Sequence, residues 1–322
     1  MLRPHWKSMM TPAPRPIRVA VLMGGPDPEH GVSLASGRQV ARALREDSSF
    51  QVSEHEIDRP DKDALLEFGA DVIFPVLHGP FGEGGPLQER LESSGMPFVG
   101  SESGPAAIGM DKCETKRRCR ESGIPTLDWT ELQSGTTCTL HFPLVVKPVD
   151  EGSSIGVRIC RDESELAEAR RKLEKTHGRL MAESLATGRE LTVGIIHGRT
   201  LPLIEIVPKN GSYDYEAKYE RDDTGYVLEP QLPAGIEDAC SEQAMNLWNE
   251  IGARDVARVD FIFDGRECWT LEINTMPGFT EHSLVPKAAA HQGMDMTTLC
   301  GSLVRAALER HDRIQENRLA RS

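Results

Sequence analysis

One segment near the C-terminal end constrains the fold most, because it reads as two short strands joined by a tight turn. Over residues 258–263 and 268–274 apolar and polar residues alternate, and Asp264-Gly265 lies between the two runs. This alternation is typical of half-buried strands in a β-hairpin. A two-residue turn would put Asp260 and Glu272 on opposite faces, whereas a three-residue loop over 264–266 puts them on one face. We predict the three-residue loop.

The polar face of this hairpin has the chemistry of a metal site. It combines two carboxylates, Asp260 and Glu272, with the carboxamide of Asn274 and contains no His or thiolate. Oxygen ligands of this kind suit a hard divalent cation such as Mg²⁺. Arg258, on the same face, would meet an anion held by the metal. The alternative is a solvated strand face with ordinary polar residues, which is common in antiparallel sheets.

Composition excludes several classes of protein. The chain has 322 residues and a net charge of -13, so it can form two or three compact units and is poorly suited to nonspecific binding of nucleic acid or anionic membrane. Seven scattered cysteines form no CxxC pair, which indicates reduced thiols and a cytoplasmic protein. No apolar run is long enough to cross a bilayer. Residues 1–16 are rich in proline without an apolar core, and we expect a disordered extension and not a signal peptide.

The first part of the chain alternates between strand and helix patterns. We predict strands over 17–23, 71–77 and 96–99, and helices over 33–44 and 87–94. This order is typical of a small parallel α/β unit, in which ligands bind beyond the carboxyl ends of the strands. Gly24-Gly25 lacks the GxGxxG spacing, and no GxxxxGK[ST] motif occurs. A nicotinamide enzyme and a Walker-type NTPase are therefore disfavoured.

The middle of the chain carries a candidate phosphate loop. A basic helix is predicted over 112–121 and strands over 142–147, 181–185 and 191–196. The small residues of 150–157 would let the backbone approach a phosphate, and two hydroxyls could cap it. Gly and Ser mark ordinary hairpins more often, but the position directly after Lys147 favours a phosphate loop.

A cluster of aromatic residues indicates a lid. The four tyrosines of the chain are Tyr213, Tyr215, Tyr219 and Tyr226, all within one polar segment. Such a loop suits a cover that closes over a ligand and excludes water. The alternative is a surface loop in which the rings cluster by chance.

Seven motifs, in order, resemble those of the D-alanine:D-alanine ligase family within the ATP-grasp superfamily. They are Gly24-Gly25 with Glu29 to Ser33, Val76 to Gly79, Met110-Asp111-Lys112, Val146-Lys147-Pro148, Glu151 to Ser154, Tyr213 to Tyr219, and Leu271 to Ser283. The resemblance implies an α/β ATP-grasp architecture of three α/β domains. These would be an N-terminal preATP-grasp domain (17–103), a central subdomain (104–184) and a C-terminal domain with the metal site and lid (185–322), with nucleotide between the last two.

The same resemblance implies a role for each matching residue. Glu29 would bind the ammonium of the first D-alanine, in a hydrogen-bonded set with Ser153 and Tyr219 that closes the lid, and His78 would lie beside that substrate. Arg258 and the N–H of Gly278 would stabilise the oxyanion, and Ser283 and Leu284 would hold the second carboxylate. The expected ATP-binding residues are Lys112, Lys147, Glu183, Leu185, Glu190 and Lys218, and the expected metal ligands are Asp260, Glu272 and Asn274.

The reaction implied is ATP-dependent ligation of two D-alanine molecules through an acyl phosphate, giving ADP and phosphate. ATP and two Mg²⁺ or Mn²⁺ ions would be the cofactors, and a homodimer is expected. Phosphoryl transfer needs positioning and charge neutralisation, and a reactive acyl phosphate needs a lid that excludes water. Peptidoglycan precursor synthesis would be the biological role.

Three departures from the family pattern bear on affinity and lid closure more than on chemistry. Gly31 replaces an acidic residue beside Glu29, Gly84 stands where an acidic residue is common, and Ser184 replaces a Lys or Phe near the adenine. The run after Tyr226 is also longer. Two alternatives stay open: a D-alanine:D-lactate ligase, which Tyr219 disfavours, and a nucleotide-binding regulatory protein, which the intact metal face disfavours.

Overall fold

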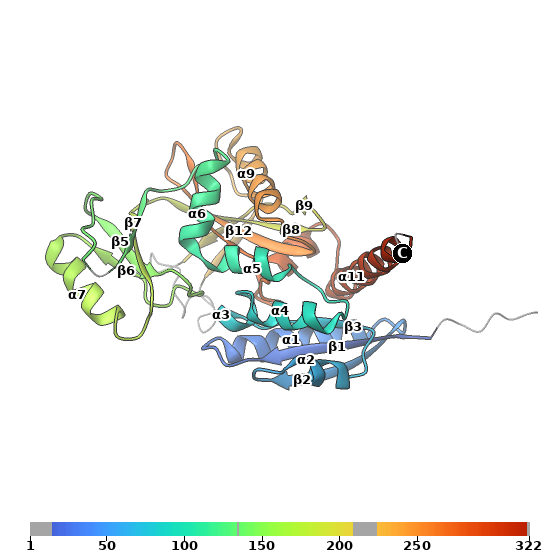
Figure 1. Cartoon of the computed structure of the whole chain (residues 1–322). Coiled ribbons are helices and arrows are strands. Elements are labelled where there is room, and N and C mark those ends of the chain that lie inside the picture. The colour runs from blue at the N-terminus through green and yellow to red at the C-terminus, as the bar shows by residue number, and fades with distance from the viewer. Residues whose placement is uncertain (1–14, 134, 209–223, 321–322) are drawn as a thin grey trace, which may run out of the picture.

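The protein folds around three β-sheets, which follow one another along the chain (Figure 1). We describe a computed structural model, which covers residues 15–133, 135–208 and 224–320. In this part of the chain, none of the helices combines the length and apolar character that a membrane span needs.

The N-terminal sheet is parallel and has the strand order β2-β1-β3. Its elements are β1 (Ile17–Gly24), β2 (Phe50–Ile57), β3 (Val72–Pro75), α1 (His30–Arg45), α2 (Lys62–Glu67), α3 (Gly79–Gly82) and α4 (Pro86–Ser94). The predicted strands over 17–23 and 71–77 and both predicted helices are confirmed. The predicted strand over 96–99 is wrong, because that segment adds only a single bridge between Ile73 and Phe98. Sequence reasoning missed β2, whose surface is largely polar and exposed.

Close packing of α1 on β1 depends on a small residue. A side chain on Gly37 would place its Cβ 2.7 Å from the Cβ of Met23 on β1. One buried hydroxyl of this helix also makes two hydrogen bonds to the backbone at the sheet, since Ser33 Oγ donates to Val76 O at 2.6 Å and accepts from Gly24 N at 2.8 Å. The helix therefore fixes the ends of β1 and β3, where the sequence predicted a ligand.

The central sheet is a smaller antiparallel layer with the order β4-β7-β5-β6. It comprises β4 (Trp129–Leu132), β5 (Leu144–Pro148), β6 (Arg158–Cys160) and β7 (Leu180–Ser184), with α7 (Glu163–Leu173) packed on one side. Its core includes Leu144, Val146, Leu166 and Ala182. The strands predicted over 142–147 and 181–185 are confirmed within two residues at each end.

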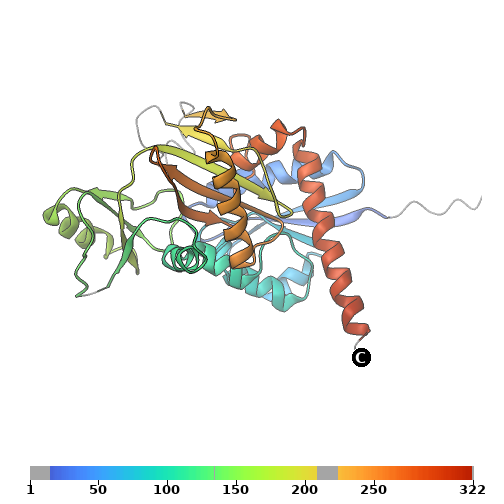
Figure 2. The ribbon, with the colours of Figure 1, turned by 90° about the horizontal axis from the view of Figure 1, so that it is seen from above.

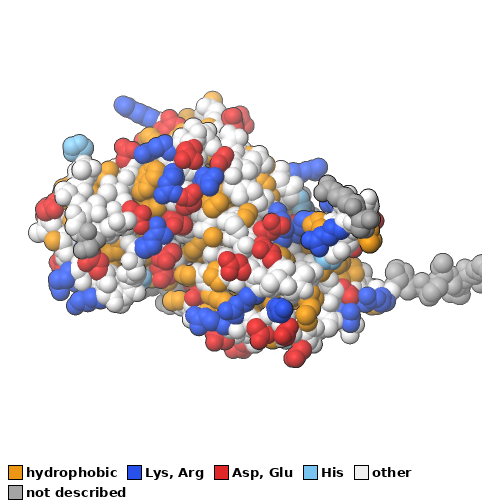
Figure 3. All heavy atoms as spheres, in the orientation of Figure 1, with side chains coloured by type: hydrophobic (Ala, Val, Ile, Leu, Met, Phe, Trp, Pro, Cys, Tyr) orange, Lys and Arg blue, Asp and Glu red, His pale blue; other side chains and the backbone are white. Residues whose placement is uncertain are grey.

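The third sheet carries the hairpin and has the order β11-β10-β8-β12-β13, with β9 paired to β8. Its strands are β8 (Arg189–Ile196), β9 (Arg199–Thr200), β10 (Ile204–Val207), β11 (Gly225–Leu228), β12 (Val256–Phe263) and β13 (Cys268–Asn274). The helices α5 (Ser103–Met110), α6 (Lys112–Glu121) and α9 (Ile236–Ile251) contact β13, although α5 and α6 precede the central sheet in sequence. Basic and acidic side chains are mixed over the face shown in Figure 3.

The hairpin loop has four residues, 264–267, so the predicted three-residue loop is wrong. A four-residue loop alone would pair Asp260 with Leu271. The register shifts between Asp260 and Phe261, so that Leu271 is the extra residue of a β-bulge and Asp260 pairs with Glu272. The predicted shared face of Arg258, Asp260, Glu272 and Asn274 is confirmed, but the bulge produces it.

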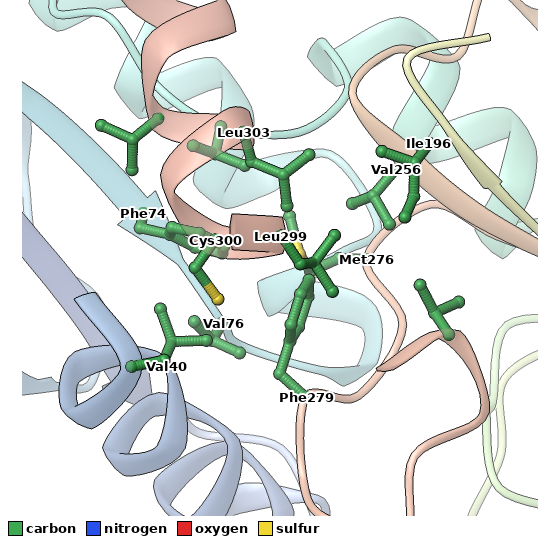
Figure 4. Close-up of a cluster of buried hydrophobic side chains, with 14 of the residues drawn as sticks. Val40, Phe74, Val76, Ile196, Val256, Met276, Phe279, Leu299, Cys300 and Leu303 are labelled. Atoms are coloured by element: carbon green, nitrogen blue, oxygen red, sulfur yellow. The ribbon is translucent and has the colours of Figure 1, made fainter. Parts of the chain in front are cut away.

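The last helix of the chain, α11 (Met296–Leu319), returns to the N-terminal unit, where it contacts α1 and β3, while α10 (Leu284–His291) before it packs on β8 of the third sheet (Figure 2). Figure 4 shows the joint, in which Leu299, Cys300 and Leu303 of α11 point into the same core as Phe74 and Phe279. One apolar core thus spans the first and last parts of the chain.

Candidate functional site

A cavity of about 60 Å³ lies where the three sheets meet. All three units supply its lining, which consists of Glu29, His78, Glu83, Gly152, Ser153, Arg258, Glu272, Asn274, Gly278, Thr280, His282, Ser283 and Leu284. Nine of the predicted site residues are among them. A neighbouring cavity of about 30 Å³ shares Glu83, Gly152, Glu272 and Asn274 and adds Lys112 and Glu151. Folding therefore brings together most of the predicted site.

Glu29 and Ser153 form the closest link between the N-terminal unit and the central loop. Glu29 directly precedes α1 and is 4% exposed, and Ser153 Oγ donates a short hydrogen bond to Glu29 Oε1. Gly152 allows this approach, since a Cβ there would lie 3.0 Å from Glu29 Oε2. A buried carboxylate in a cavity of this size suits recognition of a small ammonium group.

His78 and Glu83 form a buried polar pair beside Glu29. His78 Nδ1 lies 3.8 Å from Glu83 Oε1, and the Gly79 N–H donates to the same oxygen at 3.2 Å. Burial lowers the pKa of His78, and burial together with the Glu29 charge raises the pKa of Glu83 well above its ordinary value. Both groups therefore favour their neutral forms. His78 Nε2 has no hydrogen-bond partner among the described residues, so it is available to a ligand.

Arg258 and Asp260 form a bidentate pair on the hairpin face. Arg258 Nε donates to Asp260 Oδ1 and Nη2 donates to Oδ2, both at 2.8 Å. Thr192 Oγ1 on β8 also donates to Asp260 Oδ1, at 2.6 Å. Arg258 lines the larger cavity and Asp260 does not.

Glu272 and Asn274 lie at the boundary of the two cavities. Lys112 Nζ is 3.2 Å from Glu272 Oε2 and donates to the Glu151 carbonyl oxygen at 2.5 Å. Asn274 Oδ1 accepts from the Met276 N–H at 3.2 Å. The described residues contain no group of three His, Cys, Asp or Glu side chains arranged as a metal site. The predicted metal ligands are two carboxylates and one carboxamide. Asp260 lies opposite Glu272 across the hairpin, and oxygen ligands of this kind fit a hard cation.

A buried cluster of charges lies on the central sheet. Lys147 Nζ is 2.6 Å from Glu183 Oε2, and Lys116 Nζ makes a short ion pair with Glu183 Oε1. The sequence prediction missed Lys116, although its spacing of four residues from Lys112 on a helix places both lysines on one face. It also missed Glu83, Thr280 and His282.

The N-terminus of α10 closes the C-terminal side of the larger cavity. Ser283 precedes α10, and its Oγ accepts from the Thr280 N–H at 2.9 Å. A Cβ on Gly278 would lie 2.8 Å from that oxygen, so only glycine leaves the peptide accessible. The free N–H groups of the first helical turn favour an anion at this end of the cavity.

The remaining predicted residues lie away from both cavities or outside the described residues. Leu185 follows β7 and is half-buried, and Glu190 on β8 pairs with Ile206 and Ile262. Lys218 and Tyr219, with the predicted lid, lie outside the described residues.

Family models match two parts of the chain. A model described as "D-ala D-ala ligase C-terminus" matches residues 120–305, and one described as "D-ala D-ala ligase N-terminus" matches residues 49–101.

Curated relatives match over most of their length. A D-alanine--D-alanine ligase of Desulforudis audaxviator is 40% identical over 91% of this chain and 99% of the relative. That of Aquifex aeolicus is 40% identical over 89% of this chain and its full length. D-alanine--D-alanine ligase B of Chromobacterium violaceum is 42% identical over 88% of this chain and 95% of the relative.

Solved structures share the fold. The D-alanine--D-alanine ligase of Bacillus anthracis complexed with ATP has a TM-score of 0.82 and 30% identity, covering 93% of this chain and 99% of that one. The D-alanine-D-alanine ligase of Coxiella burnetii has a TM-score of 0.81 and 25% identity, and the match covers 96% of this chain and 100% of that one.

Proposed function

The chain belongs to the D-alanine–D-alanine ligase family, and from this premise we propose how its own residues carry the reaction. It is an ATP-dependent ligase of the ATP-grasp fold that joins two D-alanine molecules for peptidoglycan precursor synthesis. We further propose the three-domain division at 17–103, 104–184 and 185–322, which the three sheets support, although α5 and α6 pack on the third sheet.

Glu29 binds the ammonium of the first D-alanine in this proposal. Its buried carboxylate, oriented by the Ser153 hydroxyl, offers a negative charge at the wall of the larger cavity, where an ammonium group could meet it. The neutral His78, with Nε2 unpartnered among the described residues, faces the same substrate as a neutral hydrogen-bonding group.

The second D-alanine binds at α10. The carboxylate of this substrate would lie against Ser283 and Leu284, where the first-turn N–H groups favour an anion. Arg258 and the Gly278 N–H line the same cavity, and they stabilise the oxyanion that forms when the amine attacks the acyl phosphate.

ATP binds between the central and third sheets. Lys112 and Lys147 contact its phosphates in this proposal. Two observations support it: Lys112 Nζ binds the Glu151 carbonyl of the candidate phosphate loop, and Lys147 lies at the end of β5, directly before that loop. Glu183 and Leu185 lie on the adenine side and Glu190 at the ribose. Lys218 reaches the γ-phosphate from the lid. Lysines at this spacing supply the charge neutralisation that phosphoryl transfer needs.

Two divalent cations, Mg²⁺ or Mn²⁺, bind at Asp260, Glu272 and Asn274. The oxygen-only donor set supports this, as does the attraction of two cationic side chains, Arg258 and Lys112, to the same carboxylates. Bound there, the cations would neutralise charge on the ATP phosphates. The need for divalent cation in general follows from the family.

The proposal rests mainly on one observation: Glu29, Arg258 and Glu272 line the same cavity. In the proposed reaction Glu29 recognises the substrate ammonium, Arg258 stabilises the oxyanion, and Glu272 holds the cation that neutralises phosphate charge. The test is incubation with ATP, Mg²⁺ and D-alanine, with products identified by mass. D-alanine should release ADP and phosphate and give the dipeptide, and L-alanine should react poorly. Release of AMP and pyrophosphate would contradict the acyl-phosphate route.

The choice of dipeptide over depsipeptide rests on Tyr219, which is a prediction from sequence. Tyr219→Phe removes one hydroxyl from the proposed set with Glu29 and Ser153. The variant should let D-lactate compete with D-alanine, most visibly at acidic pH, where the attacking amine is protonated. The measurement is the ratio of depsipeptide to dipeptide in substrate mixtures; an unchanged ratio means that Tyr219 does not control this choice.

We make two further proposals, on the oligomeric state of the protein and on its location in the cell. We propose a homodimer, which sedimentation velocity would test. We also propose a cytoplasmic location, where ATP is available, and the seven free thiols support a reducing compartment.

A further inference from the structure

Lys116 is a buried cation to which neither the sequence nor the proposed reaction assigns a role. Its side chain is fully buried, and lysine is almost never buried without a partner. Burial lowers its pKa, and the Glu183 carboxylate opposes that effect. A cation kept in such a position at the cost of desolvation needs a specific explanation.

The carboxylate that Lys116 contacts is shared. Glu183 Oε1 meets Lys116, and Glu183 Oε2 meets Lys147 Nζ at 2.6 Å. The two ammonium groups lower the pKa of Glu183 despite burial, so the carboxylate is ionised. Two lysines and one glutamate leave this buried cluster with one net positive charge, which an anion can offset.

Lys116 also joins two sheets. It lies on α6, and its Nζ donates to Thr126 Oγ1 at 2.7 Å. Thr126 Oγ1 in turn donates to Thr270 O on β13 at 2.8 Å. Lys116 is thus anchored to the third sheet while it holds a carboxylate of the central sheet, and ATP is proposed to bind between these two sheets.

We propose that Lys116 is a positioning residue for ATP: it holds the Glu183 carboxylate and thereby keeps Lys147, and one net positive charge, directed to the nucleotide. This inference rests on the proposed role of Lys147 at the phosphates. Without Lys116, Glu183 would neutralise Lys147 completely, and the cluster would carry no net charge.

The first test is Lys116→Met, which keeps much of the side-chain volume and removes the charge. We expect the KM for ATP and the calorimetric Kd for Mg·ATP to rise at least roughly tenfold, since one partner of a buried charged set is lost. The KM for D-alanine and kcat at saturating ATP should stay within about threefold, because Lys116 does not touch the reacting atoms. Unchanged ATP affinity, or a parallel rise in the KM for D-alanine, would overturn the proposal.

The double variant Lys116→Met/Glu183→Gln separates charge from packing. It restores one net positive charge on Lys147. Because Glu183 itself lies on the proposed adenine side, Glu183→Gln alone is the reference, and adding Lys116→Met to it should change the Kd for Mg·ATP by less than about threefold. A roughly tenfold rise against this reference would mean that the loss came from packing, and the proposal would be wrong. Because this variant leaves no unbalanced carboxylate, it also serves if Lys116→Met fails to fold.

A matched control removes another ion pair with a buried carboxylate, whose two residues line neither cavity. Arg310 binds both oxygens of Asp255, at 2.7 and 2.9 Å. Arg310→Met should lower the melting temperature and leave the ATP affinity unchanged; a similar rise in KM for ATP would show that Lys116 has no specific role. If the wild type binds ATP but makes no dipeptide, the proposed function fails, while the calorimetric comparison still decides the role of Lys116.

Discussion

The joint between the N-terminal unit and α11 differs in kind from the attachment of the central sheet. At the joint, β1, β3, α1, β12, α10 and α11 share one apolar core. The central sheet has a core of its own, and its apolar link to the rest is a small cluster of Cys113, Val149 and Met181 with Trp129 beside it.

Polar contacts, more than apolar ones, attach the central sheet and its loop to the other two units. Lys112 binds the Glu151 carbonyl, Lys116 binds Glu183, and Ser153 binds Glu29. Each of these contacts includes a residue assigned to ATP or substrate. We infer that the first and third units form one body with a continuous apolar core, whereas the central sheet is held by the same groups that are proposed to bind ligand. Ligand binding and docking of the central sheet should therefore be coupled.

The largest effect should come from the two cores. Leu303→Ala at the joint and Leu144→Ala in the central sheet each remove a fully buried side chain and should cost about 2–5 kcal/mol. Hydrogen exchange should then rise throughout the first and third units in Leu303→Ala, but only in the central sheet in Leu144→Ala. Equal exchange in all three sheets for both variants would contradict the comparison.

Glu272→Gln tests the metal face of the body formed by the first and third units. Loss of one negative charge should cut kcat about 10²–10³-fold, with little change in ATP affinity, since charge neutralisation matters most in the transition state. The measurement is steady-state kinetics over a range of Mg²⁺. Glu267→Gln, in the exposed loop of the same hairpin, is the control and should behave as wild type. Normal turnover in Glu272→Gln would exclude it as a ligand.

Ser153→Ala tests the polar link between the central loop and the body formed by the first and third units. Removing the donor to the buried Glu29 carboxylate should cost about 1–3 kcal/mol, seen as a fall in kcat/KM for D-alanine. Exchange in the central sheet should also rise in the variant. Ser164→Ala, which removes an exposed hydroxyl bonded to Asp162, should change neither. If both serine variants match the wild type, the Ser153 contact does not dock the loop.

The smallest effect should come from a surface cluster of two arginines and one aspartate on the N-terminal sheet. Arg18 and Arg15 hold the pKa of Asp71 well below its ordinary value. A carboxyl with a lowered pKa stabilises the folded state above its ordinary pKa, and the contribution is lost as pH falls through the folded value. Asp71→Asn should thus cost under about 1 kcal/mol at pH 7 and progressively less below about pH 4. Chemical denaturation at several pH values checks this, and a loss that grows on acidification would contradict it.

Local patterns were enough to predict much of the fold and site. Alternating polarity gave the hairpin strands and the shared face of Asp260 and Glu272, and the two buried strands at 17–23 and 71–77 were evident from their apolar runs. The order of the motifs indicated the ATP-grasp family. Such features depend on residues close together in sequence, where steric and hydrophobic periodicity act directly.

Long-range packing decided the rest. The bulge at Leu271 corrects the register against β12, and nothing in the sequence of the loop shows it. The neutral state of Glu83 depends on burial beside Glu29, which lies more than fifty residues away in sequence. The ion pair of Lys116 with Glu183, and the return of α11 to the first sheet, likewise join distant segments. Local sequence patterns thus specify which groups the chain carries and on which elements they lie. The partners of these groups follow from the packing of distant segments, because burial and charge pairing depend on every segment that meets at the site.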